Sequence, residues 1–377
     1  MIQGPPPQGA RVAPLFIGSE IYRGSSYGPA HPLRVPRVST VMDLARALGW
    51  LPPGQFRTSP RAKPAALALW HDPAYVAALQ AAEASGEATA EMRARHNLGT
   101  LSNPVFPQVY RRPATGAGGT MLAAELLSAT PGVVHVPGGG THHGLPDRAN
   151  GFCYLNDVVL GIKVLQRSLS RIVYVDLDAH HSDGVELAFA GDPGVRMISV
   201  HEEGRWPFTG RLEDRAGGSA FNLPVPKGYN DSEARAVLHG LILPRVAEFQ
   251  PEALVLQCGA DSLTEDPLSR LALSNRAYLE AVAALVPLAP RVMVLGGGGY
   301  NPWSVGRLWT AIWGLLAGRE QPDRLPDAAV AVLGGLGWGG GGRPPPDPAL
   351  LTTLLDPPRE GPVRPEIRDR LAALARR

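Results

Sequence analysis

The chain has 377 residues, of which 44% are hydrophobic and 19% charged, so it holds enough apolar material for one large core or two smaller ones. Its 36 Lys and Arg and 34 Asp and Glu residues leave a formal net charge of +2 without a basic block, which argues against a nucleic-acid partner. No stretch approaches the roughly 20 apolar residues that span a bilayer, and the start resembles no signal peptide, so we expect a cytoplasmic protein with no membrane partner.

Strand-like and helix-like patterns alternate through the middle of the chain. Short runs rich in β-branched residues predict strands at residues 133–136, 171–178, 195–201, 253–258 and 291–296. Apolar residues at helical spacing predict helices at 118–128, 155–167, 231–249, 274–286 and 303–317. This alternation predicts an α/β fold: a mostly parallel sheet flanked by helices, with the functional site at the carboxyl ends of the strands.

The two ends of the chain differ in composition from the middle. Residues 1–14 are rich in Pro and Gly, and residues 334–348 have the sequence GGLGWGGGGRPPPDP, a composition that predicts coil at the surface. Residues 365–377 carry apolar side chains at helical spacing, so we expect a final amphipathic helix that packs against the body of the protein.

The first predicted strand with polar groups at its end lies in VVHVPGGGTHHGL, residues 133–145. Its three glycines let the backbone pass close to a bound group, and His142 and His143 follow directly. Adjacent histidines can act as metal ligands or as a proton-transfer pair. Two turn histidines half exposed to water are the alternative.

The next strand lies in YVDLDAHHSDGVE, residues 174–186, the most informative segment of the chain. Asp176, Asp178 and His180 are spaced two residues apart, so an extended backbone sends their side chains to one side. Carboxylate and imidazole together are suitable ligands for a borderline metal such as zinc. Strand-end caps and salt bridges are the alternative for the same residues.

Two later strands each deliver one further group. CGADSLTEDPLSRLAL, residues 258–273, carries Asp261 at the strand end and Asp266 on a loop before a proline. Either carboxylate can complete a three-ligand zinc site with a fourth position open. VLGGGGYNPW, residues 294–303, places Tyr300 after four glycines, as expected if a hydroxyl must be held near a reacting carbonyl. An Asp-Pro surface turn and a flexible loop are the alternatives.

Five motifs occur in the order found in histone deacetylases: GGGTHHG, GFCYLNDV, YVDLDAHHSDGVE, GADSLTEDPL and LGGGGYN. Two more segments, GPAHPLRVPR at 28–37 and LWHDPAYVAAL at 69–79, extend the likeness. The chain therefore resembles this family of zinc amidohydrolases over most of residues 15–318.

Within that family, the chain is similar to the bacterial acetoin-utilisation branch, on the evidence of NPVFPQVY at 103–110 and SVHEEGR at 199–205. The resemblance implies a single-domain fold of the arginase and deacetylase type. Its catalytic domain would span residues 15–318, after an N-terminal extension at 1–14, with residues 319–377 packed on the same domain.

The resemblance also implies a metal centre. It assigns Asp178, His180 and Asp266 to one Zn²⁺ ion per chain and gives Tyr300 the task of polarising the amide oxygen. A monovalent cation, usually potassium, is expected nearby. The backbone carbonyls and the serine assigned to this cation belong to Asp176, Asp178, His180, Ser199 and Val200, and a second such site is expected near Phe189 and Val195.

The adjacent histidines acquire a role by the same resemblance. His142 and His143 become the buried proton-transfer pair, with Asp176 orienting His142 and Asp183 orienting His143. A carboxylate on the far ring nitrogen fixes the tautomer and raises the basicity of the imidazole.

The resemblance further implies a narrow tunnel for an acyl-lysine side chain. Gly151 and Phe152 would form one wall, and Arg37 would sit near a channel beneath the metal. The family's loop after SVH is shortened here to RWPFTG, so the opposite wall is expected to be Trp206 or Phe208.

Two further positions bear on the substrate. Where many members place a rim aspartate that grips the substrate backbone, this chain has Ser102. Polyamine-selective relatives place a glutamate at the tunnel mouth, and the position matched to it, seven residues beyond Asp266, is Leu273. An apolar side chain there predicts an acetylated lysine on a protein or peptide as substrate, with a small acetylated amine as the alternative.

The expected reaction is hydrolysis of an acetamide to a free amine and acetate. Two other functions are compatible with parts of the pattern. Asp178, His180 and Asp183 fit a binuclear manganese hydrolase of the arginase kind, although Tyr300 has no role in such an enzyme. A non-catalytic acyl-lysine binder is the other, although it should lack a ligand or the tyrosine, and all the expected positions are filled.

Overall fold

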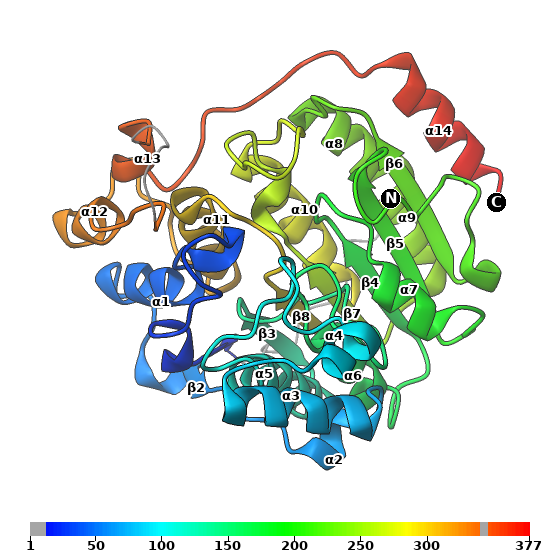
Figure 1. The fold of residues 1–377 in the computed structure, drawn as a ribbon. Helices are drawn as coiled ribbons and strands as arrows, with labels where there is room; N and C mark the ends of the chain where they lie inside the picture. Colours follow the sequence, from blue (N-terminus) through cyan, green and yellow to red (C-terminus); the bar gives the residue numbers. More distant parts are fainter. Residues whose placement is uncertain (1–12, 340–345) are drawn as a thin grey trace.

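The computed structural model describes residues 13–339 and 346–377. Within them, one sheet of eight parallel strands runs through the molecule (Figure 1). From one edge to the other the strands are β2 (Phe56–Thr58), β1 (Leu15–Gly18), β3 (Gly132–Val136), β8 (Arg291–Leu295), β7 (Ala253–Gln257), β4 (Ile172–Asp176), β5 (Val195–Glu202) and β6 (Ala220–Val225). The predicted α/β fold with a parallel sheet is confirmed.

The central strands β3, β8, β7 and β4 end level with one another. Leu295 pairs with both Val136 and Gln257, and Gln257 pairs with Asp176. These residues are the last of their strands, so the four loops that follow leave the sheet at the same edge. A site built from these loops is therefore a consequence of the strand register.

Helices cover both faces of the sheet, and the strand side chains alternate between two cores. Val173 and Val175 of β4 belong to the core beneath one set of helices, whereas Ile172 and Tyr174 belong to the other. The first face carries α1 (Val38–Ala47), α8 (Asp231–Val237), the π-helical segment η5 (Leu238–Ile242), α9 (Leu243–Phe249), α10 (Asn275–Leu285) and α11 (Pro302–Leu316). The second carries α3 (Pro73–Ser85), α5 (Arg111–Ala129) and α6 (Asp157–Leu165).

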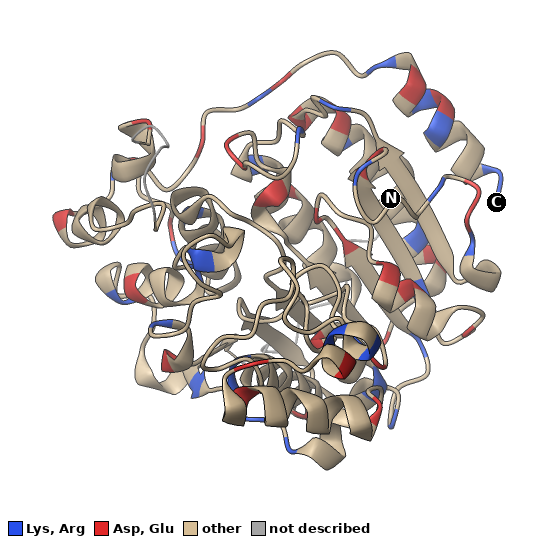
Figure 2. Cartoon of the chain, viewed as in Figure 1, with Lys and Arg blue, Asp and Glu red and all other residues tan. Residues whose placement is uncertain are grey.

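Shorter helices complete the two layers and add side chains to both cores. They are α2 (Pro64–Leu67), α4 (Ala90–His96), α7 (Asp183–Phe189), α12 (Asp327–Gly334) and α13 (Ala349–Thr352). The 3₁₀ turn η6 (Ala260–Ser262) follows β7 and matters for the site. Figure 2 shows acidic and basic residues interspersed over the helices and loops in this view. None of the helices described here is long and apolar enough to cross a membrane.

The predicted elements match the observed ones to within a few residues at most ends, but α5 begins at Arg111 and not at residue 118, and α1 to α4, α7, α12 and α13 were not predicted. The sequence patterns miss the short strands β1 and β2 and the strand β6, which contains Pro224. The helix predicted at 231–249 is three segments, because η5 winds as a π-helix immediately before Pro244, which has no N–H to donate to the preceding turn.

The C-terminal residues return to the body of the protein. Helix α14 (Pro365–Ala375) lies along the β6 side of the sheet in Figure 1, and it buries Ile367 and Leu374. The Arg364 side chain donates to Glu233 of α8 at 2.6 Å. The predicted coil at 334–348 lies partly outside the described residues, as do residues 1–12 of the predicted extension. The division of the chain at residue 318 stays a prediction.

Candidate metal centre and active site

Three ligand-bearing side chains meet beyond the carboxyl ends of β4 and β7. Asp178 and His180 follow β4, and Asp261 lies in η6 after β7. One ligand atom from each lies within 4.8 Å of the others, and His180 Nδ1 is 3.2 Å from Asp178 Oδ1 and 3.0 Å from Asp261 Oδ2. Two carboxylates and an imidazole form a set of oxygen and nitrogen donors that suits a zinc-like ion.

The electrostatics of these carboxylates also favour a cation. Asp178 and Asp261 are buried, and burial together with the negative charge of Asp178 raises the pKa of Asp261. A divalent cation between them would compensate both the lost hydration and the mutual repulsion. The donor set therefore fits a metal ion by its charge as well as by its geometry.

Asp266, the predicted third ligand, is not part of this group, and Asp261 takes its place. Asp261 lies four residues beyond the end of β7 at Gln257, whereas Asp266 lies nine residues beyond it. The carboxylate of Asp266 accepts the backbone N–H groups of Tyr300 at 2.6 Å and of Leu268 at 2.9 Å. It thus joins the tyrosine loop to the loop after β7. Of the two carboxylates that the motif offered, the resemblance selected the wrong one.

Glycines allow the neighbouring loops to close around the carboxylates. A Cβ atom on Gly259 would lie 2.0 Å from Asp178 Oδ2, and one on Gly298 would lie 2.0 Å from Asp261 Oδ2. The Gly298 N–H instead donates to Asp178 Oδ2 at 2.6 Å. The glycine run before Tyr300 is therefore required by close approach to the ligands.

The two adjacent histidines face each other beside the ligand group. Their Nε2 atoms are 2.9 Å apart, and His142 Nε2 is 3.8 Å from Asp178 Oδ1. His142 Nδ1 lies 2.7 Å from Asp176 Oδ2, and His143 Nδ1 lies 2.6 Å from Asp183 Oδ1. Each imidazole thus has a carboxylate on its far nitrogen and turns its near nitrogen toward the same point.

The pKa values of the two histidines are shifted in opposite directions by their surroundings. Burial alone would lower the pKa of His142, but the charges of Asp176 and Asp178 outweigh burial and raise it to about 9. Burial and the neighbouring His142 lower the pKa of His143 to about 4, against the opposing effect of Asp183. The pair therefore holds one proton near neutrality, on the His142 side.

Two residues absent from the predicted site extend this network. Asn150 donates from Nδ2 to the second oxygen of Asp183 at 3.0 Å, and Gln257 Nε2 lies 2.8 Å from His142 Nδ1. Asn150 precedes the GFCYL motif directly, and Gln257 pairs with Asp176 across β7 and β4. The pairing of Gln257 with Asp176 places its side chain beside Asp176 and therefore beside His142.

A cavity of about 660 Å³ opens from this site to the surface. Among its lining residues are His143, His180, Tyr300, Gly151, Phe152, Trp206, Phe208, Ser102, Asn103, Leu268 and Arg270. Tyr300 and Phe152 contact edge to face, with ring centroids 5.9 Å apart, and Trp206 contacts His143 in the same way at 4.6 Å. The predicted tunnel residues Gly151, Phe152 and Trp206 thus line one cavity with the histidine and the tyrosine.

The loop at 205–210 divides its two aromatic residues between wall and rim. A Cβ on Gly151 would lie 2.2 Å from the Trp206 ring, so the glycine lets Trp206 approach the Phe152 side closely. Phe208 lies further out and keeps 69% of its surface exposed. Trp206 is therefore the wall that faces Phe152. Ser102 also lines the cavity. At this position of the cavity wall the chain therefore presents a hydroxyl where many family members present a carboxylate.

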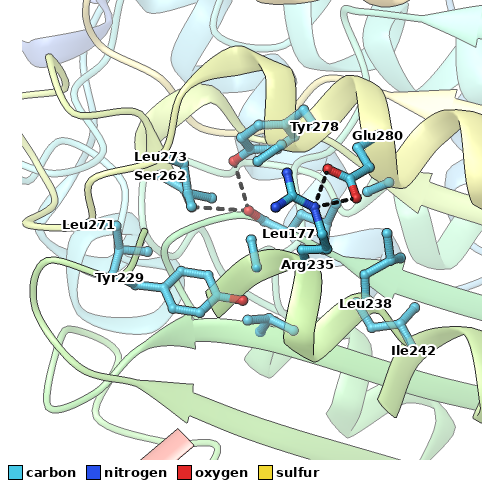
Figure 3. Close-up of a pocket in the computed structure, with 14 residues that line it drawn as sticks. Leu177, Tyr229, Arg235, Leu238, Ile242, Ser262, Leu271, Leu273, Tyr278 and Glu280 are labelled. Carbon is cyan, nitrogen blue, oxygen red and sulfur yellow. Dashed lines mark hydrogen bonds and ion pairs between the residues drawn. The ribbon is translucent and has the colours of Figure 1, made fainter. Parts of the chain in front are cut away.

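Leu273 does not line this cavity, and its predicted substrate contact is wrong. It is buried, its N–H donates to the Ser262 carbonyl, and it faces a separate apolar cavity of about 40 Å³ (Figure 3). The prediction counted seven residues from Asp266. Counted from Asp261, the same spacing gives Leu268, which does line the active-site cavity.

The remaining predicted residues lie beneath or behind the centre. Arg37 is half-buried, donates from Nη1 to the Gly297 carbonyl at 2.7 Å and stacks over Trp309. Ser199 pairs with Asp176 across β5 and β4, and its Oγ lies 2.9 Å from His201 Nδ1. The assignment of monovalent cations to this region, and to the region of Phe189 and Val195, stays a prediction.

Fold and site together define a metal-dependent hydrolase of the α/β class. Its catalytic groups are carried by loops at one edge of a parallel sheet. The comparisons with known proteins agree with this class and narrow it. The histone deacetylase domain model matches residues 31–316.

The acetoin utilization protein AcuC of Bacillus subtilis is 32% identical over 327 residues, which cover 83% of this chain and 84% of AcuC. Histone deacetylase 8 of Xenopus tropicalis is 33% identical over 78% of this chain and 82% of its own. The crystal structure of an HDAC homologue from Aquifex aeolicus superposes with a TM-score of 0.91 at 36% identity, covering 96% of this chain and all of that one. An HDAC homologue complexed with SAHA gives 0.89 at 36% identity.

The chain belongs to the histone deacetylase family, and it is an amidohydrolase that acts on linear amides.

Proposed function

We propose that this protein is a zinc-dependent deacetylase that hydrolyses the acetamide of acetyl-lysine in a protein or peptide. The observation that carries the proposal is one cavity lined by His143, His180 and Tyr300, with the Asp178, His180 and Asp261 donor set at its floor. The aromatic side chains of Phe152, beside Tyr300, and of Trp206, beside His143, line this cavity and suit an extended aliphatic chain that ends in a small amide.

Asp178, His180 and Asp261 would hold the metal ion, and His143 would act as the general base. When bound, the ion supplies a Lewis acid that polarises the amide carbonyl and lowers the pKa of a water molecule from about 15.7 toward 7. The low pKa of His143 leaves its Nε2 unprotonated, so this atom can accept the proton of the attacking water in exchange for its contact with His142 Nε2, while Asp183 holds the ring through Nδ1. His143 later returns that proton to the leaving amine.

His142 and Tyr300 complete the site from two sides. The raised pKa of His142 keeps a positive charge 2.9 Å from His143 Nε2, where it stabilises the negative charge that develops on the substrate. Tyr300 lies at the cavity, and burial and the charges of Asp261 and Asp178 raise the pKa of its phenol, so the hydroxyl stays protonated and donates to the carbonyl oxygen.

A monovalent cation, most simply potassium, is part of the proposal. It would be held by backbone carbonyls of Asp176, Asp178, His180 and Val200 with Ser199, directly behind the metal ligands. A small acetylated amine is the second candidate substrate, because Ser102 replaces the carboxylate that would bind a peptide backbone at the rim.

The test combines elemental analysis with turnover on a minimal acetyl-lysine reporter. We expect one zinc or functionally equivalent divalent ion per chain and release of acetate that stops on chelation and returns with the metal. Two manganese ions per chain with activity on guanidino compounds would replace this proposal by the binuclear hydrolase. If the protein binds one metal ion but turns over no acetylated amine, it is a non-catalytic acyl-lysine binder.

A further inference from the structure

Exposed apolar side chains gather around the mouth of the active-site cavity. In the part of the chain that the structure describes, the large hydrophobic residues with high exposure are Leu101, Leu187, Trp206 and Phe208. Trp206 and Phe208 line the cavity, and Leu101 precedes the lining residue Ser102. Only Leu187, on α7, lies elsewhere. Exposed apolar groups concentrated at one site indicate a contact surface for another molecule.

Phe208 is held in this exposed position at a conformational cost. Its φ angle is +64°, in the left-handed region where a side chain is strained and a glycine is not. The residues that follow are anchored: His181 Nδ1 lies 2.8 Å from Thr209 Oγ1, and His201 Nε2 lies 2.8 Å from the Gly210 carbonyl oxygen. Strain that neighbouring contacts enforce on an exposed aromatic side chain is expected where that side chain has a function.

Phe208 also stands between two hollows of the surface. It lines the active-site cavity and a second cavity of about 490 Å³, and the two share Glu203 and Gly204. A ligand that occupies both cavities therefore crosses Phe208. An acetylated monoamine is small enough to end inside the first cavity, whereas a polypeptide is long enough to reach across the ring into the second.

The charges at the mouth are paired except for one cation. Glu202 pairs with Arg205, and Glu203 pairs with Arg370 at 2.9 Å. Arg270 lines the cavity and is exposed, and no described residue forms a hydrogen bond or ion pair with its guanidinium. An unpaired guanidinium beside exposed aromatic side chains can pair with a carboxylate in the incoming molecule.

We propose that this rim is a recognition surface for the polypeptide that flanks the acetyl-lysine: Phe208 contacts an apolar side chain and Arg270 pairs with an acidic one. The proposal rests on the proposed deacetylase function and specifies the residues that flank acetyl-lysine in its substrate. The substrate is an acetylated polypeptide segment with apolar and acidic neighbours, in preference to a small acetylated amine.

The test compares kcat/KM for a capped N-ε-acetyl-lysine reporter with that for four acetyl-lysine peptides of equal length. Their flanking residues are Gly and Ser only, Leu added, Asp added, or Arg added. For the wild type we expect Leu and Asp each to raise kcat/KM by about tenfold over the Gly-Ser peptide, the size of one good contact at an interface. Arg should lower it.

Variants of the two rim residues separate the contributions. Phe208→Gly should abolish the Leu preference and keep the Asp preference, since glycine accepts φ +64° without strain. Arg270→Gln should abolish the Asp preference, and Arg270→Glu should reverse it toward Arg. The Asp preference of the wild type should shrink as salt rises. Leu187→Ala and Arg319→Gln, an exposed pair outside both cavities, should leave every ratio unchanged.

The outcomes distinguish this proposal from the one on which it rests. If the wild type cleaves the reporter but its kcat/KM is the same for all four peptides, the rim proposal is wrong and the deacetylase stands. If the Phe208 and Arg270 variants lower activity on reporter and peptides by the same factor, the residues act on the cavity and not on the flanks, which also overturns it. If no acetyl-lysine substrate is cleaved, the deacetylase itself is wrong.

Discussion

The floor and the rim of the active-site cavity are built differently. At the floor, Asp176 and Asp183 hold the two histidines through hydrogen bonds of 2.7 and 2.6 Å, and these groups come from a strand end, the loops after the strands and the first residue of α7. At the rim, Phe208 is exposed and strained, and the guanidinium of Arg270 has no partner among the described residues. The side chains of the floor hold one another, whereas those of the rim face outward.

This difference predicts how substitutions should act. A change at the floor removes a buried group whose neighbours were arranged around it, so it should affect metal binding or turnover with any substrate. A change at the rim leaves the floor intact, so it should alter the choice among substrates. Substitutions that violate this division would show that the two regions are coupled.

Loss of a metal ligand should have the largest effect. We expect Asp261→Ala and His180→Ala to lose both the bound metal and measurable activity, because two donors cannot close a three-ligand site. Asp266→Asn is the matched control: it keeps one of the two oxygens that accept the backbone N–H groups of Tyr300 and Leu268, and because Asp266 lies outside the ligand group the variant should keep the metal. Metal content by elemental analysis decides the assignment. Retained metal in Asp261→Ala, with loss in Asp266→Asn, would restore Asp266 as the ligand.

The next largest effect should come from the proton-transfer pair. His143→Ala should lower kcat by roughly 10²–10⁴, the usual contribution of a general base. His142→Ala should be less damaging, because the remaining His143 still accepts a proton and is still held by Asp183. Stopped assays on the minimal reporter, with metal content measured in parallel, separate the two. Equal and mild losses would mean that another group supplies the base.

Tyr300→Phe should slow turnover without changing the fold or the metal content. The loss of one donor to the oxyanion predicts a fall in kcat of roughly 10²–10³, about 2.7–4 kcal/mol. KM should change much less, since the ring still contacts Phe152. A variant that keeps more than half of the wild-type kcat would remove Tyr300 from the mechanism.

The pH profile tests the electrostatics of the floor. His142 carries its proton below its raised pKa of about 9, so kcat/KM should fall as pH rises through that value. On the acid side, activity should fall as His143 and the catalytic water become protonated, with apparent pKa values that belong to the coupled groups. Asp176→Asn removes the largest charge that raises the pKa of His142, so the alkaline limb should move to lower pH. An alkaline limb that stays in place would mean that His142 does not set it.

The sequence predicted the floor better than the rim, and the reason is physical. Strand ends in a parallel sheet meet at one edge, so spacing placed Asp178, His180 and the histidine pair at the same edge, and the family resemblance supplied their roles. The error at Asp266 arose because the loop after β7 offers two carboxylates, and the strand end at Gln257 favours the nearer Asp261. The distance of each candidate from the strand end was the signal that separates them.

The rim depends on loop conformation, which no periodic pattern encodes. The motif RWPFTG named Trp206 and Phe208 as alternatives, but only the structure shows that one forms the wall and the other the rim. The contact between Gln257 and His142 and the unpaired guanidinium of Arg270 depend on the positions of residues distant in sequence, so spacing could not reveal them.

The smallest expected effect concerns the choice between acetyl-lysine and acetylpolyamine, and it now rests on Leu268. This residue lines the cavity on the loop after β7, where an apolar side chain gives a distal ammonium group no compensation for its lost hydration. Arg270 on the same loop adds repulsion. We expect kcat/KM to favour an acetyl-lysine peptide over N-acetylputrescine and N8-acetylspermidine in the wild type, and Leu268→Glu to shift that ratio toward the polyamine by about tenfold, or 1.4 kcal/mol. Leu268→Gln is the control that adds polarity without charge and should shift this ratio little.

Leu273→Glu tests the corrected assignment, because a carboxylate buried in the core should destabilise the fold without gaining polyamine activity. A tenfold wild-type preference for either polyamine would overturn the peptide assignment, since neither Leu268 nor Arg270 can account for it.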